Sequence, residues 1–272
     1  MSAPELLAGL IARARAADGA PPFSDQSLIE LGAGGRRMLG DGTGAVVFSD
    51  TEFELVVDPE HRRRGLGAAL LDRVLRETAR PVLAWAHGDA PASRALASRF
   101  GFAAVRTLLQ LRAPVAPGTS PPALTSGLPT REFQPGRDNA AWLALNARAF
   151  AAHPEQGALT QADLEARMAE PWFDPSSLLL LERDGALVGS CWLKVEDGIG
   201  EFYAVAVDPD AQGQGLGGLL VDLGLARLAE LGIATASLYV EGDNEPALRL
   251  YRSRGFGDFT VDVQWRLGAT RP

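Results

Sequence analysis

Hydrophobic and polar positions follow helical spacing in some stretches of this chain and strand spacing in others, and the two patterns alternate along the sequence. In the second half, apolar residues recur at the spacing of an α-helix near residues 139–150, 160–169, 214–231 and 244–254. Short apolar or alternating runs predict strands near residues 178–181, 187–194, 200–207, 235–240 and 259–266. Strands that alternate with helices predict an α/β fold, in which helices flank a central sheet.

The first half ends in the same order of elements but begins differently. Residues 1–19 predict an amphipathic helix. Arg13 and Arg15 lie inside its pattern instead of ahead of an apolar run, so the segment is not a signal peptide. We expect no clear pair of strands before Thr51. We therefore expect the first half to lack part of its sheet around residues 40–48.

A repeated segment relates the two halves. Residues 55–59 read Leu-Val-Val-Asp-Pro, residues 205–209 read Val-Ala-Val-Asp-Pro, and a glycine-containing loop and an apolar helix follow both, at an offset of 150 residues. Two copies at so long a period indicate a duplicated domain. Between the copies, residues 112–130 are rich in Pro, Ser and Thr and have no hydrophobic period. We predict an N-terminal domain at 1–113, a linker at 114–128 and a C-terminal domain at 129–272.

Charge and cysteine content narrow the function classes. The formal net charge is -8 with a pI near 5.0, so no overall positive field attracts nucleic acid, and no stretch is apolar enough to span a membrane. The single cysteine, Cys191, cannot form an internal disulfide and is typical of a small buried apolar residue. We expect a cytoplasmic monomer that contacts neither nucleic acid nor a membrane.

The repeated glycine loop is the strongest candidate for chemistry. A strand, Asp-Pro and then Gln/Arg-x-x-Gly-x-Gly open a helix, whose first backbone N–H groups are unpaired and lie at the positive end of the helix dipole. That arrangement binds phosphate. A dinucleotide fingerprint is the alternative, because residues 213–218 also fit G-x-G-x-x-G. The first copy argues against it, since Arg63 stands at the position of the first glycine.

The motifs V-x-V-x-P, Q/R-x-x-G-x-G and a later helix ending in Y-x-x-x-G-F resemble the GCN5-related N-acetyltransferases (GNAT). The resemblance implies two tandem GNAT domains, each with a mixed central sheet flanked by helices and a splayed pair of strands that binds acyl-CoA. In that family the glycine loop holds the pyrophosphate of acetyl-CoA. We therefore expect acetyl-CoA as co-substrate.

Acetyl transfer to an amine needs a base, an oxyanion site and an acid for the leaving thiolate. Glu201 lies six residues before Val207 on one strand, so alternation directs its side chain to the same face, beside the cofactor arm, where it can act as the base. Tyr251 precedes Gly255-Phe256, where the family places the acid. The backbone N–H groups of residues 205–207 are expected to hold the oxyanion. The first half has Thr51 and Ala97 at these places, so we expect no catalysis there.

Further strings, among them Trp192-Leu-Lys-Val and Trp85-Ala-His-Gly, are similar to the mycothiol synthase family. The resemblance implies acetylation of the cysteinyl amine of cysteinyl-glucosaminyl-inositol, the last step of mycothiol biosynthesis, in the C-terminal domain. It places substrate contacts at Asp25, Glu155, Lys194, Glu201 and Tyr239. Lys194 is the only lysine of the chain.

The same resemblance places acetyl-CoA contacts in both halves. In the first half they are Leu55, Val56, Val57, Arg63, Arg64, Gly65, Leu66, Gly67 and Ala68. In the second half they are Val205, Ala206, Val207, Gln212, Gly213, Gln214, Gly215, Leu216, Gly217, Gly218, Asn244, Glu245, Pro246, Ala247, Leu248 and Arg249.

Two other functions remain open from the residues alone. One is a tandem acetyltransferase for another amine, such as an aminoglycoside or a polyamine, which an acidic cleft would favour. The other is a non-catalytic acyl-CoA sensor. We predict no metal, because His61, His87 and His153 are scattered without the spacing of a zinc site.

Overall fold

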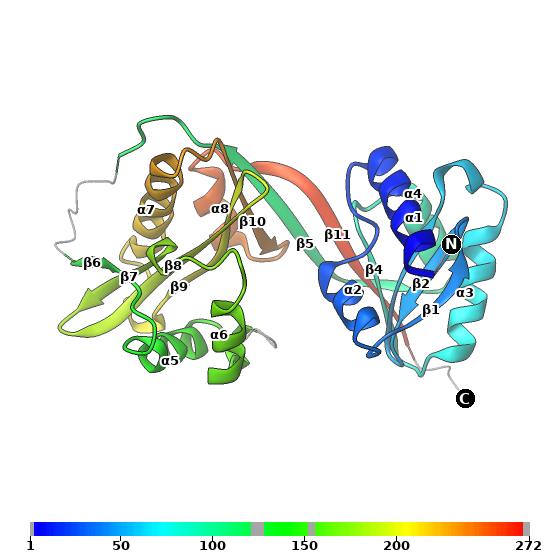
Figure 1. The fold of residues 1–272 in the computed structure, drawn as a ribbon, viewed down its shortest axis with the longest axis horizontal. Helices are drawn as coiled ribbons and strands as arrows, with labels where there is room; N and C mark the ends of the chain where they lie inside the picture. The colour runs from blue at the N-terminus through cyan, green and yellow to red at the C-terminus, as the bar shows by residue number, and fades with distance from the viewer. Residues whose placement is uncertain (1–2, 121–127, 152–155, 269–272) are drawn as a thin grey trace. The chain divides into compact units, whose positions relative to one another are not determined.

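The computed structural model describes residues 3–120, 128–151 and 156–268. The chain forms two compact units. Unit 1 runs to Gln110 and adds Glu241–Asp243 and the residues from Asp258 on, while unit 2 holds Leu111–Val240 and Asn244–Gly257. Figure 1 shows the elements of each unit. The predicted division at 1–113, 114–128 and 129–272 follows the sequence repeat and stays a prediction, and residues 121–127 of the predicted linker lie outside the described residues.

Unit 1 is a mixed sheet with helices on both faces. Its strands follow the order β1-β2-β3-β4-β11-β5, and β3 with β4 is a parallel pair while β1–β2, β2–β3 and β4–β11 are antiparallel. The elements are α1 (Ala3–Asp18), α2 (Asp25–Gly32), β1 (Arg37–Asp41), β2 (Gly44–Phe48), β3 (Glu52–Val57), η1 (Pro59–His61), α3 (Leu66–Glu77), β4 (Val82–Ala86), α4 (Pro91–Phe100), β5 (Ala103–Pro114) and β11 (Gly257–Leu267).

The expectation that the first half lacks a pair of strands before Thr51 is wrong, because β1 and β2 form a regular antiparallel hairpin there. Every residue of β2 is buried. Val46 and Phe48 pack in one core cluster, and Ala45 and Val47 pack in another on the opposite face. A strand that is covered on both faces has no alternation of polar and apolar positions, so its period could not be seen in the sequence.

Unit 2 has the same plan. Its strands follow the order β10-β9-β8-β7-β6, with β9 and β10 parallel and the other pairs antiparallel. The elements confirm the predicted helices and strands: β6 (Thr130–Glu132), α5 (Asn139–Ala149), η2 (Gln156–Ala158), α6 (Gln161–Met168), η3 (Pro175–Ser177), β7 (Leu178–Arg183), β8 (Ala186–Glu196), β9 (Ile199–Val207), η4 (Pro209–Ala211), α7 (Leu216–Glu230), β10 (Thr235–Glu241) and α8 (Glu245–Arg252).

Two helices cover opposite faces of the unit 2 sheet (Figure 1). On one face, Trp142 and Leu145 of α5 pack in a cluster with Trp192 and Ala204. On the other face, α7 lies so close to the sheet that a Cβ on its Gly224 would collide with the Phe202 ring. We call these the α5 face and the α7 face. Their separation decides which side chains of β9 share a site.

The repeat is also visible in how each glycine loop is anchored. The Asp-Pro aspartates, Asp58 and Asp208, cap the short helices η1 and η4. Arg13 of α1 contacts Asp58 at 2.6 Å, and Arg148 of α5 contacts Asp208 at 2.6 Å. Each arginine lowers the pKa of its aspartate, so both anchors stay ion pairs. Among the residues that the structure describes, no helix is both long and apolar enough to cross a membrane.

Candidate active site

The parallel strands β9 and β10 separate partway along their length. Their pairing ends at Phe202 opposite Leu238, whereas β9 continues to Val207. The backbone of residues 203–207 is therefore unpaired on the β10 side and open to a ligand that has amide groups of its own. This is the splayed strand pair that the sequence predicts for an acyl-CoA arm.

The glycine loop of unit 2 leads from β9 into α7. Gly213 and Gly215 have φ angles of 74° and 78°, in the left-handed region, and an added Cβ at either would meet nothing within 4 Å. Gly215 caps α7 without a side-chain hydrogen bond, so the first N–H groups of the helix stay available. Arg183 donates to Gln214 at 2.8 Å and steadies the loop. Three features of the loop suit a pyrophosphate such as that of acetyl-CoA: its available backbone N–H groups, the positive end of the helix dipole, and the absence of side chains on its open side.

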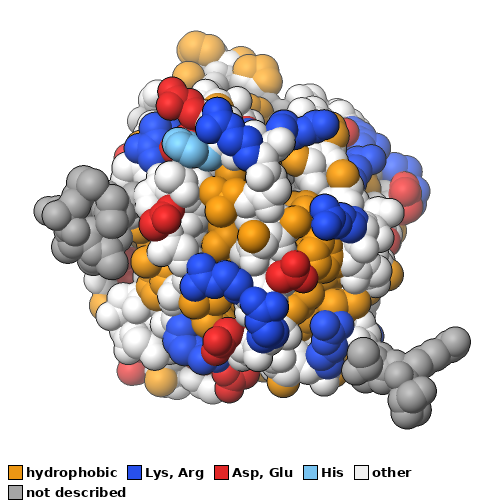
Figure 2. Space-filling model, turned by 90° about the vertical axis from the view of Figure 1, so that its right-hand side faces the viewer, with side chains coloured by type: hydrophobic (Ala, Val, Ile, Leu, Met, Phe, Trp, Pro, Cys, Tyr) orange, Lys and Arg blue, Asp and Glu red, His pale blue; other side chains and the backbone are white. Residues whose placement is uncertain are grey.

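Unit 1 contains a cleft of about 620 Å³ around the same elements, including Val57, Gly65, Ala84, His87 and Trp265. Figure 2 shows one face of the molecule where basic side chains (blue) stand among apolar ones (orange). Such a surface combines local positive charge with apolar walls despite the net charge of -8.

The three loop arginines of unit 1 are not equivalent. Arg62 forms two hydrogen bonds with Asp18, at 2.7 and 2.6 Å, and donates to the Val57 carbonyl at 3.0 Å. Arg63 and Arg64 have no ion-pair partner among the described residues, and Arg63 adopts φ 62°, in the left-handed region of its counterpart Gly213. Arg63 and Arg64 are therefore the side chains that can meet a phosphate.

Glu201 does not lie on the face that alternation predicts. The register of β8 and β9 shifts between Trp192 and Leu193, which leaves one extra residue, Tyr203, on β9. Glu201 consequently lies opposite Lys194, on the α5 face, whereas Val207 faces α7. The alternation argument was wrong because one bulged residue reverses the face of every residue before it.

Tyr251 lies on the other side of the strand. Its ring packs against Phe256 at 5.8 Å, and Phe256 packs against Phe202 at 5.8 Å, on the α7 face. Burial, with a smaller contribution from Cys191, raises the pKa of Tyr251 to about 12, so the phenol keeps its proton at neutral pH. Glu201 and Tyr251 thus flank the point where β9 and β10 separate, one from each face.

The predicted substrate contacts fall into two groups. Lys194, Glu201 and Tyr239 share the α5 face, because Ser237 pairs with Glu201 and Tyr239 is two residues further along β10. Tyr239 is 47% exposed, which suits a contact with a ligand. Asp25 is exposed on unit 1, at the first position of α2. Glu155 lies outside the described residues.

Sequence reasoning missed an aromatic wall beside Lys194. The Lys194 ammonium lies 5.3 Å from the centroid of the Trp172 ring, and Trp172 packs on Tyr203 at 5.2 Å. Tyr203 is the bulged residue, and its hydroxyl accepts a hydrogen bond from Arg167 at 3.1 Å. The strings Trp172-Phe-Asp-Pro and Trp192-Leu-Lys could have drawn attention to these rings, but only the bulge brings them together.

The bulge also changes which residue of unit 1 corresponds to Glu201. Strands β2 and β3 pair without a register shift, so counting back from Val57 by sheet position reaches Glu52 and not Thr51. The expected match with Thr51 is therefore wrong. Glu52 bonds Arg36 at 2.7 Å, and Arg36 is 8% exposed. A carboxylate held by a buried guanidinium is a poor base.

A second cluster that sequence reasoning missed lies inside unit 1. Burial lowers the pKa of His87, but its contacts with Asp262 and Glu54 outweigh burial and raise the pKa to about 9. Burial raises the pKa of Glu54, yet His87 and Ser24 hold it below its ordinary value. The string Trp85-Ala-His-Gly contains His87, but no local signal links it to Glu54 and Asp262, because the three lie far apart in the sequence.

Two remaining predictions concern α8 and metals. The predicted contacts at 244–249 form the start of α8, where the Asn244 side chain accepts from the Ala247 N–H at 3.2 Å. Cys191 is buried, and burial raises its pKa far above its ordinary value. Within the described ranges, no group of three or more His, Cys, Asp or Glu side chains is placed to hold a metal ion.

Comparison with known proteins agrees with this geometry. The family model described as "Acetyltransferase (GNAT) family" matches residues 142–256, and the "Acetyltransferase (GNAT) domain" model matches residues 30–104. A GCN5-related N-acetyltransferase from Sphaerobacter thermophilus superposes with a TM-score of 0.70 at 21% identity, over 97% of this chain and 93% of that one. A tandem GNAT protein of the clavulanic acid pathway gives 0.68 at 17% identity, over 99% and 96%. These likenesses show the fold.

Sequence relatives are much nearer. The mycothiol acetyltransferase of Clavibacter sepedonicus is 50% identical over 97% of this chain and 93% of its own length. That of Thermomonospora curvata is 49% identical over 92% and 88%. The chain belongs to the mycothiol acetyltransferase family of tandem GNAT proteins.

Proposed function

We propose that this protein transfers an acetyl group from acetyl-CoA to the cysteinyl amine of cysteinyl-glucosaminyl-inositol, the final step of mycothiol synthesis, and that unit 2 performs the chemistry. The observation that carries the assignment to unit 2 is the pair Glu201 and Tyr251, placed on opposite faces at the point where β9 and β10 separate. The acceptor rests on the family resemblance of the sequence and on the relatives, which are named mycothiol acetyltransferases.

Each group has a role that suits its face. Glu201 accepts a proton from the acceptor ammonium, directly or through water, on the α5 face. The amine nitrogen then attacks the thioester carbonyl, and the unpaired backbone N–H groups of residues 205–207 stabilise the oxyanion. The carbon–sulfur bond breaks on the α7 face, where Tyr251 supplies a proton to the thiolate; the nitrogen gives its second proton to solvent, from which the phenol is protonated again. Base and acid therefore act on different atoms, the amine nitrogen and the CoA sulfur, from opposite faces of β9.

The acceptor side is polar, as a substrate rich in hydroxyl groups requires. Lys194 and Tyr239 share the α5 face with Glu201 and supply an ammonium and a phenol. Trp172 offers an apolar surface for a sugar ring beside them. Asp25 and Glu155 remain acceptor contacts that the family resemblance alone predicts.

Unit 1 in this proposal binds acetyl-CoA without turning it over, through the backbone of residues 55–57 and the loop 63–68. Glu52 is ion-paired with Arg36, and Ala97 cannot supply a proton. The face that corresponds to the acceptor side is also filled, because Ser24 and Ser27 of the α2 start bond Glu54 there. These hydrogen bonds occupy the Glu54 carboxylate on that side.

The test is thiol release from acetyl-CoA with cysteinyl-glucosaminyl-inositol, alongside aminoglycoside and polyamine acceptors. Glu201→Gln should lower kcat by about 100-fold to 10,000-fold, the range for a lost general base, and leave acetyl-CoA binding intact. Glu230→Gln, on the exposed side of α7, is the matched control.

The outcomes separate the competing functions. Turnover limited to the cysteinyl glycoside supports the proposal. Turnover only with another amine keeps the mechanism and rejects the acceptor, and acetyl-CoA binding without turnover of any amine supports a sensor instead. We also propose a monomer in the reducing cytoplasm, consistent with a single buried cysteine; light scattering in solution tests the oligomeric state.

A further inference from the structure

Three charged side chains of unit 1 form a buried row that no part of the proposed reaction uses. His87 Nδ1 lies 3.0 Å from Asp262 Oδ2, and His87 Nε2 lies 3.6 Å from Glu54 Oε1. The side chains of His87, Asp262 and Glu54 are 12%, 14% and 2% exposed. Ions removed from water at this depth are stable only with each other. We call the three residues the buried clamp.

The clamp joins three segments that are distant in the sequence. Glu54 belongs to β3, His87 follows β4 directly, and Asp262 belongs to β11. Asp262 also accepts a hydrogen bond from the Gly88 N–H at 3.1 Å. Glu54 accepts from the Ser24 N–H at 2.9 Å and from the Ser27 hydroxyl at 2.9 Å, which fixes the first turn of α2.

The clamp stands where β3 and β4 separate. These parallel strands pair only from Glu52 to Glu54, and the last pair is Glu54 with Trp85. Beyond that pair, the end of β4 has a neighbour only on its other side, where Val263 pairs with Ala86 and Gln264 with Trp85. The position of β4 at the cleft therefore depends on β11.

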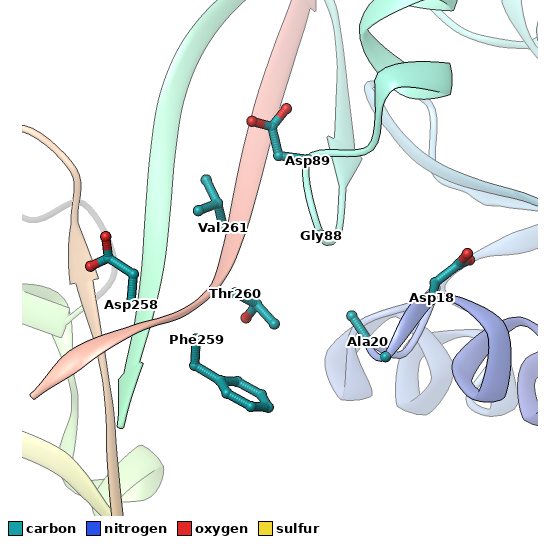
Figure 3. Close-up of a pocket in the computed structure, with 9 residues that line it drawn as sticks. Asp18, Ala20, Gly88, Asp89, Asp258, Phe259, Thr260 and Val261 are labelled. Atoms are coloured by element: carbon teal, nitrogen blue, oxygen red, sulfur yellow. The ribbon is translucent and has the colours of Figure 1, made fainter. Parts of the chain in front are cut away.

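The same strand also builds the wall of the cleft. Trp265 of β11 lies opposite Ala84 and lines the 620 Å³ cleft, as His87 does. A second pocket of about 490 Å³ is lined by Gly88 and Val261, the chain neighbours of His87 and Asp262. Figure 3 shows its walls: Ala20 after α1, Gly88 after β4, and Thr260 on β11. The segments that the clamp joins thus contribute to the walls of both pockets.

We propose that the buried clamp makes β11 a working part of the ligand cleft of unit 1, so that binding of a CoA-type ligand there and the docking of β11 stabilise each other. His87 is a positioning residue in this device. The inference rests on the proposed acetyl-CoA site of unit 1. It gives that non-catalytic site a role: the bound ligand stabilises β11, the strand that follows α8, and α8 carries Tyr251.

The experiment uses the full chain and CoA as the probe, which carries no acetyl group and so permits no turnover. Calorimetry counts the bound CoA, and hydrogen exchange follows the amides of residues 259–267 with and without CoA. We expect two bound CoA molecules and at least tenfold slower exchange in β11 when both sites are filled.

Variants then separate the clamp from general stability. His87→Gln and Asp262→Asn should weaken one of the two CoA sites at least tenfold, leave the other unchanged and abolish the CoA-dependent protection of β11. Asp50→Asn, an exposed residue paired with Arg37, is the matched control. Asp262→Glu keeps the charge and should restore part of the protection, which distinguishes a positioning role from a folding defect.

Several results would overturn the inference. One is that the protein with an intact clamp binds only one CoA. Another is that two CoA molecules bind but hydrogen exchange in β11 does not change. The third is that both clamp variants bind two CoA molecules with unchanged affinity. All are independent of the acceptor, because no acceptor is present. Failure to acetylate the cysteinyl glycoside would reject the proposed function and leave these binding results standing.

Discussion

Lys194 lies directly opposite Glu201 across β8 and β9, on the α5 face of the sheet. The pair exists because Tyr203 is bulged out of the register. We predict that Lys194→Gln raises the KM for the acceptor about tenfold, which corresponds to ~1.4 kcal/mol, because the proposed contact between the ammonium and the acceptor is lost. The KM for acetyl-CoA should change less than twofold in steady-state assays. A larger effect on acetyl-CoA than on the acceptor would contradict the placement.

Tyr251→Phe removes a proton donor and little else, since its ring packing on Phe256 can persist. We expect kcat to fall by about 100-fold while acetyl-CoA binding, measured by calorimetry, stays within twofold. A bound acetyl-CoA that turns over at the normal rate in this variant would remove Tyr251 from the mechanism.

Gly215→Ala places a side chain at φ 78°, where an L-residue costs roughly 1–2 kcal/mol, and points it at the open side of the loop. We expect the KM for acetyl-CoA to rise at least tenfold with a smaller change in kcat. Gly257→Ala is the control, because Gly257 has an ordinary φ and a Cβ there also meets nothing within 4 Å. Equal effects of the two substitutions would argue against the loop as the phosphate site.

His87 makes the stability of unit 1 depend on pH. Its pKa is about 9 in the folded protein and 6.5 ordinarily, so the folded state holds the proton more tightly. The stabilisation is complete below about pH 6.5 and is lost as pH rises through 9, for a total of about 3 kcal/mol. Glu54 and Asp262 are the charged groups that face the ring.

Urea unfolding at pH 6 and pH 10 checks this linkage. The difference in unfolding free energy between the wild type and His87→Gln should shrink toward pH 10, because the wild type has then lost the charge that the variant never had. A constant difference across this range is the adverse result.

Local patterns predicted most elements of the fold. Short-range signals predict the glycine loop, α7 and β9, because hydrophobic periodicity, the Asp-Pro pair and the glycine spacing each span only a few residues. The hairpin of β1 and β2 escaped because both faces of β2 are covered. Burial on two sides erases the alternation on which the prediction depends.

The sequence predicted which residues form the candidate site better than it predicted how they are arranged. Glu201 and Tyr251 were chosen from their positions in motifs, but one bulged residue decided the face of Glu201 and changed its counterpart in unit 1 to Glu52. Such a shift has no marker in a single sequence. The buried clamp could not be predicted from sequence patterns, because His87 and Asp262 are 175 residues apart.

The place of β11 imposes an order on synthesis. Gly257–Leu267 completes the sheet of unit 1 yet follows unit 2 in the chain, so on the ribosome β4 waits with an unpaired edge until unit 2 has emerged. An exposed strand edge invites pairing with other chains. A nascent protein stopped just before Gly257 would carry that edge permanently, so a premature stop at that point would damage a unit that is mostly translated earlier.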